Sequence, residues 1–243
     1  MTIIRDLTVS LHELAEIQSE QGKPACVNSY EESLDLVEKI GDKAGASACA
    51  ANLGNAYLEI AEIRDLDQAD HWFRRSLKLY EELNNSLRQG RCWGSLGHIA
   101  RERFKEAHAA QKPPEYLLRH LNDALQSYWM ALKLFPQDDV DDLATTHNSI
   151  GVIYQYAGDI DQALAHYREA IRYCEIMGHL HSAGMCRSNV ARTLARASRL
   201  SDALDYAQAA LRDYETFGDR AAAEIQETKE LISDIQQDLQ SQG

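Results

Sequence analysis

The chain has 243 residues, 44% of them hydrophobic, and a net charge of −13. This length can bury one or two ordinary cores or build one elongated array, and the acidic balance argues against a general nucleic-acid-binding or anionic-membrane surface. Only four prolines occur among many helix-forming residues, and no apolar run has the length of a signal-peptide core or a membrane span. We therefore expect a helical, cytoplasmic protein that does not bind membranes.

The first 42 residues are expected to form a degenerate pair of helices. In the stretch ELAEIQSEQGKPACVNSYEESLDLVEKIGD, Tyr30 and Ser33 lie three residues apart and so on one helix face. The same step from an aromatic to a small residue recurs later in the chain. The N-terminal segment is therefore predicted to be a weakly preserved copy of a repeated unit.

From residue 43 onwards a pattern of small and aromatic residues repeats. Gly54, Gly97, Gly151 and Ala191 recur at spacings of 43, 54 and 40 residues. Each is followed by a triplet with internal spacings of four and three: Ala69, Phe73, Ser76; Ala124, Tyr128, Ala131; Ala163, Tyr167, Ala170; Ala203, Ala207, Ala210. These spacings place each triplet on one helix face, and small side chains let two helices approach to about 8 Å. The pattern predicts helical hairpins in which the small residue marks the contact.

This pattern resembles the tetratricopeptide-repeat family over roughly residues 10 to 218, in its longer form of about 40 residues per repeat. One unit matches the family motif at Trp93, Leu96, Gly97, Ala124, Tyr128, Ala131 and Pro136, and the next at Ile150, Gly151, Tyr154, Gly158, Ala163, Tyr167 and Ala170. The chain departs from the motif at Ala191, which replaces glycine, and in having only one repeat that ends in proline. The resemblance implies an all-α, right-handed α-solenoid of about five helix-turn-helix repeats with a C-terminal capping helix. Similar arrays end larger bacterial signalling proteins.

The expected domain organisation is a single array over residues 1–243, with about eleven helices. Its predicted parts are a degenerate repeat at 1–42, repeats at 43–84, 85–136, 139–178 and 179–218, and a capping helix at 219–240. The repeat at 85–136 carries about fifteen extra residues, so both of its helices should be longer, with Pro113 or Pro114 beginning the second. Side chains of this extension at 100–121 either pack inside it or serve a partner or a second copy of the chain: Phe104, Tyr116, Leu117 and Leu121.

The cysteines follow the repeat. Cys49, Cys92 and Cys186 each lie five residues before the repeated small residue, and Thr146 fills that position in the remaining unit. No CxxC pair occurs, so neither a zinc site nor a disulfide framework is indicated. A small buried position at a helix contact explains these residues better than redox chemistry does.

The first helices of the repeats should line a concave groove, as the family resemblance implies. Helical phase relative to the small residue selects the side chains that point away from the core, among them Ala51, Leu58, Glu59, Gly94, Glu102, Val152, Tyr156, Ser188 and Ala195. From this surface we assign seven residues to partner binding: Asn55, His98, Arg101, Asn148, Gln155, Arg192 and Arg196. The predicted wall is polar, rich in amides and locally basic.

The sign of the charge reverses locally near the C-terminal repeats. Between Ile176 and Ser201 there is no acidic residue, whereas four arginines occur: Arg187, Arg192, Arg196 and Arg199. Arginines in a concave wall suit the carboxylate of an acidic peptide or chain terminus, or a phosphate. Alternatively, they pair with acidic residues of adjacent helices such as Asp213, Glu215 or Glu224. Both interpretations stay open at this stage.

No catalytic motif is present: the chain has no GxxxxGK[ST], GxSxG or HExxH. His179 and His181 lack a third metal ligand, and the acidic run 138–142 lacks the glycine and distal glutamate of a calcium loop and so is typical of a helix cap. We therefore predict no enzyme activity, cofactor or metal.

The predicted function is a protein-interaction scaffold that binds a peptide or partner segment. In its more specific form, the chain is the sensor or scaffold part of a larger signalling protein. The alternative is a nucleic-acid-binding solenoid that uses the Arg187–Arg199 face. Net charge and the lack of interleaved aromatic residues disfavour it.

Overall fold

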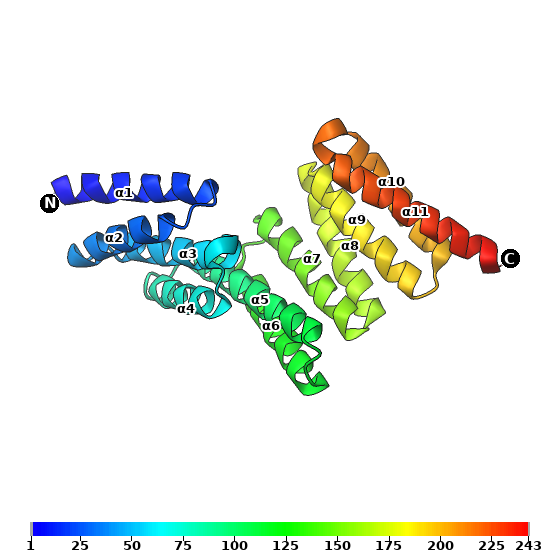
Figure 1. Cartoon of the computed structure of the whole chain (residues 1–243), viewed down its shortest axis with the longest axis horizontal. Helices are drawn as coiled ribbons and strands as arrows, with labels where there is room; N and C mark the ends of the chain where they lie inside the picture. Colours follow the sequence, from blue (N-terminus) through cyan, green and yellow to red (C-terminus); the bar gives the residue numbers. More distant parts are fainter. Residues whose placement is uncertain (1, 243) are drawn as a thin grey trace. The chain divides into compact units, whose positions relative to one another are not determined.

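A computed structural model describes residues 2–242 and, within them, the side chains of residues 4–241. The described part is all-helical, as predicted, with eleven α-helices and two short 3-10 helices (Figure 1). The α-helices are α1 (Thr2–Glu20), α2 (Cys26–Lys39), α3 (Lys43–Glu59), α4 (Leu66–Glu82), α5 (Ser86–Ala109), α6 (Pro114–Leu134), α7 (Val140–Ala157), α8 (Ile160–Met177), α9 (Leu180–Arg196), α10 (Leu200–Glu215) and α11 (Ala222–Gln242). No helix among the described residues is both long and apolar enough to cross a membrane.

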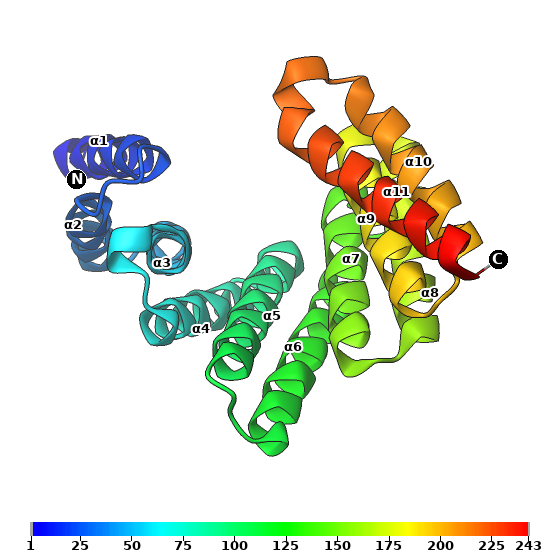
Figure 2. The ribbon, with the colours of Figure 1, turned by 45° about the vertical axis from the view of Figure 1, so that its right-hand side comes forward.

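The chain divides into two compact units, Met1–Phe135 and Pro136–Gly243, here called unit 1 and unit 2. In unit 1 the helices pack as the pairs α1 with α2, α3 with α4 and α5 with α6 (Figure 2). In unit 2 the pairs are α7 with α8 and α9 with α10, and α11 packs on α10. The helices of each unit thus pack in consecutive pairs, with α11 last. In sequence, unit 1 ends at Phe135 and unit 2 begins at Pro136.

Close contact between the paired helices confirms the predicted role of the repeated glycines. A Cβ atom placed on Gly151 would lie 2.7 Å from Cδ1 of Tyr167, and one on Gly97 would lie 2.7 Å from Cε1 of Tyr128. The same holds for Gly54, whose Cβ would lie 2.8 Å from Cδ2 of Phe73. The aromatic ring of each second helix therefore occupies the space that a side chain on the first helix would need.

The predicted extension is present in unit 1. Helices α5 and α6 have 24 and 21 residues, compared with 17 each for α3 and α4. Pro114 is the first residue of α6, where its missing N–H costs no hydrogen bond. Phe104 and Leu121 are buried, so they pack internally, whereas Tyr116 is 57% exposed.

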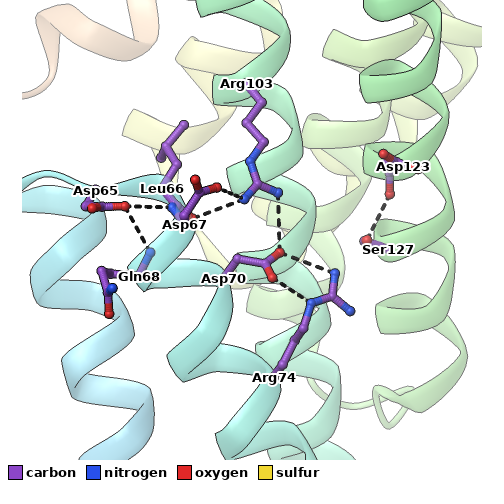
Figure 3. A network of polar contacts seen from close by, with 9 residues as sticks. All are labelled: Asp65, Leu66, Asp67, Gln68, Asp70, Arg74, Arg103, Asp123 and Ser127. Atoms are coloured by element: carbon purple, nitrogen blue, oxygen red, sulfur yellow. Dashed lines mark hydrogen bonds and ion pairs between the residues drawn. The ribbon is translucent and has the colours of Figure 1, made fainter.

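Polar side chains fix the helix starts and join neighbouring repeats. The Asp65 carboxylate caps α4 by accepting hydrogen bonds from the backbone N–H groups of Asp67 and Gln68 at 2.9 and 3.0 Å (Figure 3). Arg103 of α5 donates to Asp67 at 2.6 Å, tying α5 to α4. Asp139 caps α7 in the same way, accepting from the Asp142 N–H at 3.4 Å, as predicted for the acidic run.

Candidate functional site on the inner wall of unit 2

A hydrogen bond between side-chain amides joins the two first helices of unit 2. Asn189 Nδ2 of α9 donates to Asn148 Oδ1 of α7 at 3.0 Å, and both residues are half-buried. Beside this pair lies a cavity of about 60 Å³ lined by side chains of α7, α8 and α9, including Thr145, Asn148 and Met185. The α7–α9 surface around this amide pair is called the inner wall of unit 2 below.

One stripe of α9 extends along this wall. Met185, Asn189, Arg192 and Arg196 are separated by four, three and four residues, so they share one helix face. Met185 is 43% exposed. The Arg192 guanidinium lies 3.6 Å from the Glu227 carboxylate of α11, and Arg196 is exposed with no carboxylate partner among the described residues. The stripe therefore presents two cations, of which one is weakly paired and one unpaired.

The other two arginines of the basic segment are structural. Arg187 is mostly buried and pairs with both Glu175 and Asp213, the latter being a predicted partner. Arg199 pairs with Asp202 at 2.6 Å within the first turn of α10. Internal pairing thus explains Arg187 and Arg199 but not Arg192 and Arg196. The face available to a nucleic acid is less basic than the sequence predicts.

Replacing Arg187 by alanine should lower the free energy of unfolding by about 2 kcal/mol, because the mostly buried Asp213 carboxylate loses its cation. Urea denaturation followed by circular dichroism measures the change. The matched control is Arg172→Ala in the same unit, which breaks an exposed pair with Glu169 at 2.7 Å and should cost at most about 0.5 kcal/mol. Equal losses in the two variants would contradict the structural role of Arg187.

Two residues that helical phase predicts to face the wall are buried instead. Ser188 and Leu58 were expected to point away from the core, but they are only 3% and 6% exposed. Leu58 packs in the α3–α4–α5 core, and Ser188 lies against Tyr214 of α10. Asn189, one position beyond Ser188, is the wall residue that sequence reasoning missed. The shift arises because neighbouring helices, rather than the small residue alone, decide which side is covered.

The side chain of Gln155 in α7 is hydrogen-bonded within the α7–α8 pair. Its Oε1 accepts a hydrogen bond from the Tyr167 hydroxyl at 2.7 Å, so this amide oxygen helps to hold the ring that packs on Gly151. Of the four predicted residues in unit 2, the structure thus brings Asn148 and Arg192 to one wall, with Arg196 further along the same stripe of α9.

The remaining predicted residues lie in unit 1. Asn55 of α3 is exposed, and His98 and Arg101 of α5 lie 3.5 and 3.6 Å from the Glu102 carboxylate. Burial, together with the charge of Arg101, lowers the pKa of His98. The Arg101 Nε is buried and has no hydrogen-bond partner in the described part of the chain. His98 and Arg101 thus share the Glu102 carboxylate on α5, whereas Asn55 lies on α3.

The histidines near the inter-repeat junction lie beside carboxylates of other helices. His179 Nδ1 lies 3.2 Å from Asp141, and His181 Nε2 lies 3.3 Å from Glu224. No group of three His, Cys, Asp or Glu residues within the described part could hold a metal ion. Each histidine instead joins neighbouring helices through a carboxylate.

Comparisons with known proteins match part of the chain to a family and its fold to several solved structures. A family model described as tetratricopeptide repeat matches residues 142–216, which covers most of α7 to α10. The search of curated proteins finds no match. A thermophilic tetratricopeptide-repeat protein from Thermus thermophilus has a similar fold, with a TM-score of 0.59 and 17% identity over 91% of this chain and 98% of that one.

Two further solved structures are similar in fold. Aspartyl phosphate phosphatase F from Bacillus subtilis has a TM-score of 0.71 and 12% identity, over 97% of this chain and 60% of that one. A Signal Transduction ATPase with Numerous Domains from Pyrococcus horikoshii, which has a tetratricopeptide repeat sensor, has a TM-score of 0.63 and 17% identity. That match covers 94% of this chain but only 32% of the ATPase. At sequence identities of 12 to 17%, these similarities show a shared fold and not a shared function.

Proposed function

We propose that the chain, which matches the tetratricopeptide-repeat family model over residues 142–216 and resembles such proteins in fold, is a protein-binding scaffold whose inner wall of unit 2 holds an extended segment of a partner that carries a carboxylate. The amide pair of Asn148 and Asn189 carries this proposal. A side-chain amide both donates and accepts, so it can hydrogen-bond the N–H and C=O groups of an extended peptide.

The two arginines of the stripe support the choice of an acidic ligand. A guanidinium binds a carboxylate in a bidentate, charge-assisted manner. Arg196 has no competing carboxylate among the described residues, and the 3.6 Å contact of Arg192 with Glu227 is long enough to be exchanged for a better partner. Exposed Met185 adds a flexible apolar contact at the other end of the stripe.

A sensor or scaffold role in cytoplasmic signalling is the more specific form of the proposal. It is supported by the fold of the repeat sensor in the Pyrococcus horikoshii ATPase, which this chain resembles over 94% of its length. In such a role the affinity comes from several modest polar contacts, and no reaction takes place on the array.

Reversing the charge of both arginines, Arg192→Glu with Arg196→Glu, should abolish partner capture and leave the melting temperature nearly unchanged. The measurement is affinity capture from native lysate with quantitative mass spectrometry. The matched control is Arg168→Glu with Arg172→Glu, two exposed arginines at the same spacing on α8, which gives the same change in net charge. A partner that binds through the wall is lost only with the α9 reversal.

Three results would count against this function. Loss of capture in both reversals would indicate a non-specific charge effect, and unfolding of the α9 variant would show that its arginines are structural. Captured material that is nucleic acid, and that dissociates steeply with salt, would favour the alternative function.

A further inference from the structure

A second cavity in unit 1 occupies the position that corresponds to the pocket of unit 2. It lies between α1, α2 and α3, has a volume of about 380 Å³, and is lined by His12, Ala48 and Cys49 among others. The stretches KIGDKAGASACAANLG (39–54) and IMGHLHSAGMCRSNVA (176–191) align without gaps, so Ala48 and Cys49 correspond to Met185 and Cys186. Because alanine replaces methionine, the cavity beside Cys49 stays open, whereas its counterpart has only about 60 Å³.

A histidine faces the thiol in this cavity. His12 Nδ1 of α1 lies 3.6 Å from Cys49 Sγ of α3. On the other side of the ring, Nε2 lies 3.4 Å from the Glu16 carboxylate and 3.3 Å from the Asn52 amide, and the ring packs edge-on against Tyr30. The Glu16 carboxylate accepts a proton carried on Nε2, whereas Asn52 Nδ2 donates only to an Nε2 without a proton. In the tautomer that pairs with Glu16, the Nδ1 lone pair is directed at the thiol.

Cys92, the equivalent cysteine of the next repeat, has no such histidine beside its thiol among the described residues. Cys92 occupies the same repeat position, and its thiol donates to Ser76 at 3.5 Å just as the Cys49 thiol donates to Ser33 at 3.5 Å. No histidine interacts with Cys92 within the described residues, and burial raises the pKa of both thiols. Both are therefore protonated at rest, and only Cys49 has a base within reach of its proton.

The charged side chains around the cavity favour positively charged molecules over negatively charged ones. Glu13, Glu16 and Asp42 line it, and none of the described residues that line it is a lysine or an arginine. Negative charge at the mouth of a cleft raises the local concentration of cations and lowers that of anions.

We propose that Cys49 is a covalent modification site for small cationic or neutral electrophiles, with His12 as the group that accepts the thiol proton. In the reaction with a methanethiosulfonate, Cys49 Sγ forms a disulfide bond with the thiol sulfur of the reagent. The S–S bond of the reagent breaks, methanesulfinate leaves with the electron pair, and the proton passes to His12 Nδ1. No external oxidant or reductant is needed.

The test labels the full chain with two methanethiosulfonates, one bearing trimethylammonium and one bearing sulfonate, and follows each cysteine by peptide mass spectrometry. With the cationic reagent Cys49 should react at least about tenfold faster than Cys92 and Cys186. The cationic reagent should modify Cys49 about tenfold faster than the anionic one. His12→Gln should slow Cys49 about tenfold and leave Cys92 unchanged.

A second variant keeps the inference testable if His12→Gln destabilises the fold. Ala48→Met introduces the methionine that stands at the equivalent position of unit 2, and by filling the cavity it should reduce the rate of Cys49 to that of Cys92. Equal rates for Cys49 and Cys92 in the unaltered chain, or equal rates with the two reagents, would overturn the proposal. So would fast labelling that persists in Ala48→Met.

Discussion

Leucine in place of Gly151 should lower the free energy of unfolding by about 3 kcal/mol through overpacking at the contact of α7 with α8. Even the first carbon of a side chain would lie 2.7 Å from Cδ1 and Cε1 of Tyr167. The Tyr167 ring is fully buried and its hydroxyl is hydrogen-bonded to Gln155 at 2.7 Å, so the ring cannot withdraw without losing that bond. Urea denaturation monitored by circular dichroism measures the effect.

Gly94 of α5 provides the matched control. It is also a mid-helix glycine, but apart from its chain neighbours and the backbone of its own helix, no atom of the described residues lies within 4 Å of the position its Cβ would take. Gly94→Leu should therefore gain about 0.5 kcal/mol from the higher helix propensity of leucine. Unchanged stability in Gly151→Leu, or equal losses in both variants, would contradict the packing explanation of the repeated glycines.

The fold could be predicted because its contacts repeat at fixed spacing. The fourth repeat supports this view through its departure from the pattern, since Ala191 replaces the glycine and Ala207 replaces the ring, and both are fully buried. The extra methyl group on one helix is matched by the absent ring on the other. Local periodicity thus carried enough information to define the helix pairs and their contact residues.

The candidate site was less predictable because it depends on contacts between repeats. Asn148 was predicted to face the wall, but its partner Asn189 was missed, since helical phase alone could not resolve a shift of one residue from Ser188. The pairing of Arg187 with Asp213 and Glu175 also joins three different helices. His12 was not assigned at all, because the degenerate first repeat gave no phase for α1.

Acidification should destabilise unit 2 through a pair of buried histidines. His147 Nδ1 of α7 lies 3.1 Å from His166 Nδ1 of α8. Burial, reinforced by the nearby His166, lowers the pKa of His147 to about 4, and burial lowers the pKa of His166 as well. The other groups that act on the pair are Glu169, which raises both pKa values, and Arg172, which lowers that of His147.

The direction in which pH changes the stability follows from the number of protons bound by the folded and unfolded states. Between pH 6.5 and pH 4 the unfolded chain protonates His147 while the folded chain keeps it neutral, so the unfolded state binds more protons and stability falls as the pH falls. The lowered pKa of His166 acts in the same direction. For His147 alone the loss between pH 7 and pH 5 is about 2 kcal/mol. Relief of repulsion in a chain of net charge −13 acts in the opposite direction, so the contribution must be measured as a difference between variants.

When the pH falls from 7 to 5, the unaltered chain should lose about 2 kcal/mol more unfolding free energy than the His147→Phe variant, which has no histidine to protonate at this position. Urea denaturation at several pH values measures it, and His108→Phe, at an exposed histidine of α5, serves as the control that should show no such shift. A pH-independent difference for His147→Phe would mean that the folded chain takes up these protons as readily as the unfolded one. The hydrogen-bonded histidine pair would then be charged in the folded state, and the close contact of α7 with α8 would have to tolerate that charge.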